Sequence, residues 1–173
     1  GVCLGRWGIE DLSVISTSIN NQLLDRIRSI NVNRSGDRRA PHKPLLLLIA
    51  IAKLLQGERE LDFGEVESLL RPLLKAYAPP VQGRAQPELP YWHLRSDQLW
   101  EIPGAAELPM QQGGFPQMEA LRGTSGHLPE AYAKALLASE SLVASVVQMI
   151  LDAHFPESLH DDILVAVGLT SFT

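Results

Sequence analysis

Cations gather where an apolar helix is expected to begin, in the stretch Arg38-Arg39-Ala40-Pro41-His42-Lys43-Pro44. Proline fits the first turn of a helix, and the residues from Leu45 to Leu55 are apolar at nearly every position. The first N–H groups of a helix have no partner within it, and together with the helix dipole they attract an anion. The pattern therefore predicts an anion-binding site to which His42 and Lys43 add direct contacts. A solvated basic loop that only caps a core helix is the alternative.

A second stretch joins prolines to aromatic residues, Pro87-Glu88-Leu89-Pro90-Tyr91-Trp92-His93-Leu94. The prolines favour an extended backbone that leads into an aromatic strand. Side chains of a strand alternate between its two faces, so Tyr91 and His93 would share one face and Trp92 and Leu94 the other. One face would remain available to a ligand while the other packs into the core. The alternative is a hairpin whose aromatic side chains serve only the core.

A third candidate is the short run Gly123-Thr124-Ser125-Gly126-His127. Its glycines permit close approach of another backbone, and the side chains of Thr124, Ser125 and His127 can form hydrogen bonds. A plain turn between helices is the alternative.

Catalytic and metal-binding patterns are missing from the sequence. It contains no GxSxG, Walker A, HExxH or Rossmann glycine motif, and the single Cys3 excludes an intramolecular disulfide or a CxxC pair. Neighbouring residues of a helix diverge by roughly 100°, so His160, Asp161 and Asp162 would not converge on one ion. Acidic residues instead favour the start of a helix. We expect no active site and no metal site in this segment.

The composition is that of an ordinary globular domain, with 173 residues, 45% of them hydrophobic and 20% charged. A formal charge of −5 argues against a nucleic-acid-binding protein. The charge is unevenly distributed, however. Residues 21–53 have seven basic side chains against two acidic ones, a net of +5, and the rest of the chain carries −10. The basic end can therefore attract a polyanion despite the total.

Hydrophobic periodicity and the positions of proline and glycine predict a mainly α (α+β) domain with one short β-hairpin in a winged-helix-like arrangement. The hairpin would pair Tyr91–Leu94 with Gln98–Ile102, and Pro72 would kink its helix or separate two short helices. The expected helices are Asp11–Val32, Leu45–Leu55, Phe63–Tyr77, Gln117–Leu121, Pro129–Ala138, Ser139–His154 and Pro156–Val167. The longest apolar run, Leu45–Ala52, is too short to span a bilayer. Without a visible signal peptide, we expect a cytoplasmic location.

Three runs together resemble the sulfur-binding domain (SBD) of phosphorothioate-dependent, McrA-like restriction endonucleases that contain an HNH nuclease domain. They are Ala40–Leu48, Pro87–Leu94 followed by Leu99-Trp100, and Ala153–Leu164. The resemblance extends roughly from Leu23 to Leu169. It implies three parts of the chain, an N-terminal extension with a helix (1–20), the SBD (21–169) and a linker remnant (170–173).

The resemblance also implies double-stranded DNA as the partner, with sulfur in place of a non-bridging phosphate oxygen. In the family, a Tyr-Pro pair, the stem of a basic residue and a small side chain form an apolar sulfur cavity. The equivalent positions here are Leu89-Pro90, Lys43 and His93, with Tyr91 adjacent. Leu89 replaces the aromatic residue, Lys43 stands where arginine is common, and His93 is larger than the small residue.

The remaining contacts to DNA are expected from basic and polar side chains. Phosphates would be held by the cations that surround the start of the apolar helix, Arg34, Arg38, Arg39, His42 and Lys43. Base edges would be read near the modified step by His93, Thr124, Ser125, Gly126 and His127.

Cleavage belongs, by the same resemblance, to a separate HNH domain that uses a divalent metal. We expect this domain to need no cofactor, to perform no catalysis and to bind no membrane. Two other classes stay open. One is an ordinary winged-helix DNA-binding domain centred on residues 57–101. The other is a protein-interaction module that uses the acidic C-terminal helices.

Overall fold

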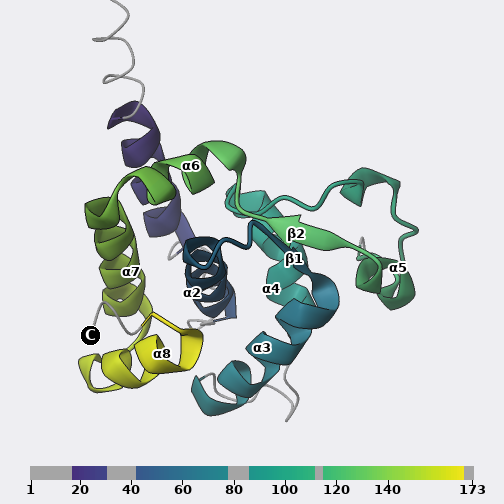
Figure 1. The fold of residues 1–173 in the computed structure, drawn as a ribbon. Helices are drawn as coiled ribbons and strands as arrows, with labels where there is room; N and C mark the ends of the chain where they lie inside the picture. Colours follow the sequence, from purple (N-terminus) through teal and green to yellow (C-terminus); the bar gives the residue numbers. More distant parts are fainter. Residues whose placement is uncertain (1–16, 31–41, 78–85, 112–114, 170–173) are drawn as a thin grey trace, which may run out of the picture.

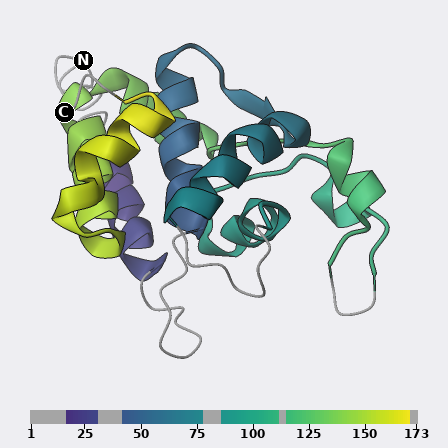
Figure 2. The same ribbon diagram turned by 90° about the horizontal axis from the view of Figure 1, so that it is seen from below.

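A helix that is apolar on almost every side, α2 (His42–Leu55), lies at the centre of the structure (Figure 1). The computed structural model describes residues 17–30, 42–77, 86–111 and 115–169. Every residue of α2 from Pro44 to Ala52 is buried. A helix without a polar face must be covered on all sides. Other helices therefore surround it, with α6, α7 and α8 packed on one side and α3 and α4 on the other (Figure 2).

The surrounding elements follow the order in which the chain leaves α2. They are β1 (Glu60–Asp62), α3 (Phe63–Tyr77), α4 (Glu88–His93), the 3-10 turns η2 (Leu94–Asp97) and η3 (Ala105–Glu107), α5 (Met118–Arg122), β2 (Ser125–His127), α6 (Glu130–Ala138), α7 (Glu140–His154), η4 (Glu157–Leu159) and α8 (His160–Val167). Residues 17–29 form a further helix, with Leu23 and Ile27 buried.

The predicted helices are confirmed over most of their lengths. Phe63–Tyr77 has the predicted bounds, and Pro72 lies inside one continuous helix, so the two short helices considered there are not formed. The last helix is shorter than predicted because its first turn, η4, is a 3-10 helix. Gly168 ends it with φ 91°, a left-handed conformation that glycine adopts without strain. The predicted residues 11–16, 31–32 and 79–85 lie outside those that the structure describes.

The mainly helical class with a small antiparallel β pair is confirmed, but other residues form the pair. β1 is antiparallel to β2, with Leu61 opposite Gly126. From the predicted hairpin, only Glu101 enters this sheet, through an isolated bridge to His127.

The prediction that Tyr91–Leu94 is a strand is wrong, because Glu88–His93 is the helix α4 and Leu94 begins η2. Four alternating residues fit either structure. Pro90, Tyr91 and Leu94 are buried, which is the spacing of one helical face as well as part of a strand pattern. Proline in the first turn of a helix removes no internal hydrogen bond, so Pro90 is compatible with α4.

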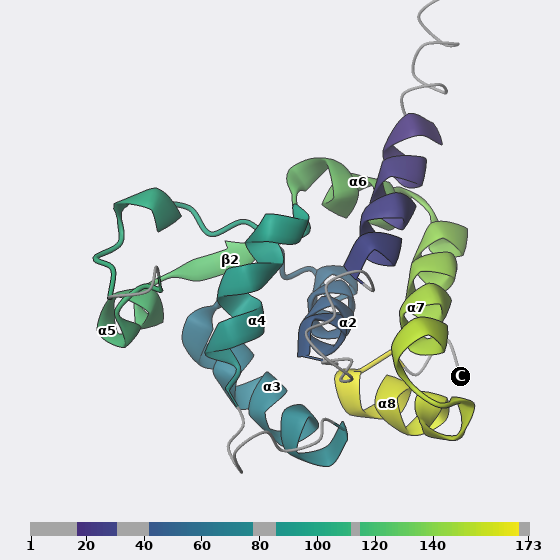
Figure 3. The same cartoon turned by 180° about the vertical axis from the view of Figure 1, so that it is seen from behind.

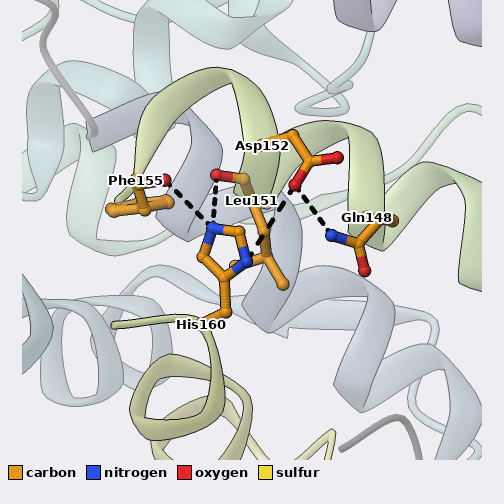
Figure 4. A network of polar contacts seen from close by, with 5 residues as sticks. All are labelled: Gln148, Leu151, Asp152, Phe155 and His160. Atoms are coloured by element: carbon orange, nitrogen blue, oxygen red, sulfur yellow. Dashed lines mark hydrogen bonds and ion pairs between the residues drawn. The ribbon is translucent and has the colours of Figure 1, made fainter. Parts of the chain in front are cut away.

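His160 connects the last two long helices (Figure 4). Its Nε2 lies 3.0 Å from the carbonyl oxygens of both Leu151 and Phe155, so this nitrogen carries the proton and donates to them. Its Nδ1 lies 4.0 Å from Asp152 Oδ1. The imidazole therefore fixes the start of α8 against the end of α7. Within the described residues, no group of three or more metal-ligating side chains is found.

In the part of the chain that the structure describes, no single helix is long and apolar enough to cross a bilayer. The helices α6 and α7 reach that length and composition only as a pair bent by 113°.

Candidate nucleic-acid interface

Leu89 and His93 lie one turn apart on the exposed face of α4. Leu89 is 37% exposed, which is unusual for a large apolar side chain, and His93 is also exposed. Side chains at positions i and i+4 of a helix are neighbours. A strand would have placed Tyr91 beside His93. The helix instead places Leu89 there and directs Tyr91 and Pro90 inward. Figure 3 shows α4 between β2 and α2, so this face lies close to the other two candidate stretches.

The basic stretch reaches the end of α4 through an ion pair. Lys43, in the first turn of α2, places its Nζ 2.6 Å from Asp97 Oδ2 at the end of η2. The side chains are only 21% and 6% exposed, respectively. Partial burial strengthens such a pair relative to one in water. The first and second stretches therefore meet at this contact, 54 positions apart in the sequence.

The second and third stretches are joined by a buried hydroxyl pair. Thr124 Oγ1 donates to the carbonyl of Leu121 at 2.6 Å, so the Tyr91 hydroxyl donates its own proton to Thr124 Oγ1 at 2.9 Å. The Tyr91 ring packs edge-on against Phe63 and Trp100, with centroids 4.9 and 5.9 Å away. Burial raises the pKa of Tyr91 to about 12. Tyr91 is 0% exposed and therefore positions the site rather than touching a ligand.

We expect Tyr91→Phe to lower the free energy of unfolding by about 1 kcal/mol, because Thr124 loses a buried hydrogen bond. Chemical denaturation measures this change. The matched control is Tyr77→Phe at the half-buried end of α3, for which we expect a smaller loss. Equal losses for both variants would contradict a linking role for Tyr91.

Within β2, successive side chains alternate between two environments. Ser125 and His127 are half-buried on one face of the strand, whereas Gly126 is buried on the other, against Trp100. His127 Nδ1 lies 2.8 Å from the carbonyl oxygen of Leu128, which can only accept, so Nδ1 carries a proton. Ser125 and His127 are thus the members of this run that can face a ligand, while Gly126 accommodates the indole.

Three charged side chains surround His93. Burial lowers the pKa of His93, the positive charges of Lys43 and Arg95 lower it further, and Asp97 opposes them. Burial also lowers the pKa of His42. Both imidazoles are therefore neutral at pH 7.

Arg95 and Phe115 are site residues that sequence reasoning missed. The Arg95 guanidinium lies 3.9 Å from the centre of the Trp92 ring, a stacking contact that holds a half-buried cation beside α4. The Phe115 ring centroid lies 6.0 Å from that of His93. The position of Arg95 directly after the aromatic run was the available signal, but the run was interpreted as a strand and its turn as a connection. Arg34, Arg38 and Arg39 lie outside the residues that the structure describes.

Comparison with known families decides which kind of site this is. The sequence model of the ScoMcrA-like DNA sulfur-binding domain matches residues 20–172. The chain belongs to this family. The resemblance inferred from the order of the three stretches is therefore confirmed, and the SBD is a recognition module.

Solved SBD structures share the fold. The sulfur-binding domain of ScoMcrA complexed with phosphorothioated DNA has a TM-score of 0.72 and 26% identity, covering 84% of this chain and 96% of that one. The corresponding domain of SprMcrA, also complexed with phosphorothioated DNA, has a TM-score of 0.70 and 23% identity, covering 89% and 96%. The complete type IV phosphorothioation-dependent restriction endonuclease ScoMcrA matches with a TM-score of 0.70 and 25% identity, over 84% of this SBD and 32% of the enzyme. A search of curated proteins found no significant match.

Proposed function

We propose that this SBD binds double-stranded DNA in which sulfur replaces one non-bridging phosphate oxygen. The observation that carries the proposal is the exposed Leu89 on α4, next to Pro90 and close to the start of α2. An apolar surface beside a basic helix start suits an anion that has one apolar, polarizable atom. Family membership and the SBD complexes with phosphorothioated DNA support the same conclusion.

Leu89 discriminates between the two anions by chemistry rather than by charge. A thiophosphate keeps its negative charge, but its sulfur is larger and a poorer hydrogen-bond acceptor than oxygen. A phosphate oxygen pressed against Leu89 would lose hydrogen bonds to water at a cost of about 1–3 kcal/mol. Sulfur loses less and gains dispersion contacts with the same carbons. Only one non-bridging position can face this surface, so the domain selects one phosphorus stereoisomer.

The remaining contacts divide into backbone and base recognition. Phosphates on either side are bound by the start of α2 and by the arginines that precede it, through Arg34, Arg38, Arg39, His42 and Lys43. Base edges are read by α4 and the β2 region, through His93, Thr124, Ser125, Gly126 and His127.

In this proposal the domain recognises DNA and a separate HNH nuclease domain cleaves it with a divalent metal. The SBD corresponds to 32% of the ScoMcrA endonuclease, which leaves most of that enzyme for other tasks. Recognition as described needs neither a metal nor a cofactor in the SBD.

A competition shift assay tests the function. Three duplexes of one sequence are compared, the unmodified one and the two resolved phosphorothioate stereoisomers. We expect one isomer to bind at least about tenfold more tightly than unmodified DNA, which corresponds to about 1.4 kcal/mol. Equal affinity for all three duplexes would overturn the proposal and favour an ordinary DNA-binding domain.

A further inference from the structure

A buried carboxylate lies beside the lysine that should face the DNA. Asp97 ends η2, directly after α4, and its side chain is 6% exposed. Its Oδ2 lies 2.6 Å from Lys43 Nζ. A negative charge at this place works against the binding of a polyanion, so attraction of DNA alone does not account for it.

The pair differs from ordinary surface ion pairs of the same domain. Lys134 and Glu130, neighbours on α6, are both 67% exposed, with 3.2 Å between Nζ and Oε1. Such exposed pairs are weak and exchange readily with water and salt. The more buried Lys43 pair is screened less and holds its geometry more firmly.

This geometry determines what Lys43 presents to a ligand. The backbone of Lys43 is fixed in the first turn of α2 and its ammonium is fixed at η2, so its methylenes span the distance between these elements. The two opposite charges largely cancel beyond a few ångströms. The side chain therefore offers an apolar stem and little net charge.

The pair lies next to the exposed face of α4. His93 shares that face with Leu89, and the charges of Lys43 and Asp97 both act on its imidazole. A free ammonium here would attract an ordinary phosphate at least as strongly as a thiophosphate, because oxygen is the better hydrogen-bond acceptor.

We propose that Asp97 is a specificity-determining positioning residue that holds the Lys43 ammonium away from the DNA. The backbone then meets the lysine stem and a nearly neutral pair, which selectively weakens binding of unmodified DNA. This inference rests on the proposed function, because it concerns the ratio of affinities for phosphorothioated and unmodified duplexes.

Asp97→Asn tests the proposal, since asparagine keeps the shape and removes the charge. We expect affinity for the unmodified duplex to rise about fivefold at 0.1 M salt, and affinity for the thio-duplex to rise less. The sulfur preference therefore falls. The plot of log affinity against log salt should steepen by about 0.9, the value for one additional phosphate contact. A merely structural role for Asp97 would change neither the preference nor the slope in this direction.

Two further variants complete the test. Glu130→Gln removes the same charge from the exposed pair on α6 and should change both affinities equally. Lys43→Met with Asp97→Asn replaces the pair by neutral groups, and we expect this double variant to keep the wild-type preference and salt slope even where Asp97→Asn alone folds poorly. An unchanged preference in Asp97→Asn, or a slope reduced by about 0.9 in the double variant, would overturn the role of Asp97. Failure of the proposed function is recognised separately, by wild-type protein that binds all duplexes equally.

Discussion

Leu89→Asp should abolish the preference for phosphorothioated DNA. The substitution replaces the exposed apolar side chain of α4 with a carboxylate of similar length. The sulfur then loses its dispersion contacts and meets a like charge, whose repulsion at an effective dielectric constant of 20–80 costs about 1–3 kcal/mol. We expect affinity for the thio-duplex to fall at least about tenfold and to approach that for the unmodified duplex. Competition binding with both duplexes measures the ratio.

Leu137 provides the matched control for this variant. It is 50% exposed on α6, so Leu137→Asp introduces the same charge into a comparable surface position without touching α4. We expect the sulfur preference to remain within about twofold of the wild-type value, since surface substitutions have small effects. If Leu89→Asp behaves like Leu137→Asp, the apolar face of α4 does not recognise sulfur.

Gly126→Ala should cause the largest loss of stability among the substitutions considered. An ideal Cβ at Gly126 would lie 2.4 Å from Trp100 Nε1 and 2.5 Å from its Cε2, far inside normal contact distance. Trp100 is 2% exposed and packs against Tyr91, so the indole has little room to retreat. Overpacking of this kind costs about 3 kcal/mol. Chemical denaturation measures the change in the free energy of unfolding.

The opposite result is expected at Gly64, which serves as the control. A Cβ there meets no atom within 4 Å, and the residue lies inside α3. Alanine in a helix interior is more favourable than glycine by about 0.5–1 kcal/mol, so Gly64→Ala should stabilise the domain. A stable Gly126→Ala variant with wild-type denaturation would show that β2 and Trp100 are not tightly packed.

Local sequence pattern determined the helical framework of this domain. Leu45–Ala52 has no polar position, so only a buried central helix satisfies it, and α2 is that helix. The bounds of Phe63–Tyr77 followed in the same way from its apolar spacing and its neighbouring turn residues. The order of the three motif stretches was also sufficient to indicate the family, because it combines features too distant to agree by chance.

The tertiary structure alone decided how the site is assembled. The residues from Tyr91 to Leu94 fit a strand or a helix equally well, and packing against Phe63 and Trp100 selects the helix. The partners that hold the site together lie far away in the sequence, with Asp97 54 positions from Lys43 and Thr124 33 positions from Tyr91. Local pattern carries no information about such distances, since they depend on how the helices pack around α2. A sequence can therefore indicate which side chains bind the DNA, while the fold determines that the charge of Lys43 is paired and that Leu89 faces outward.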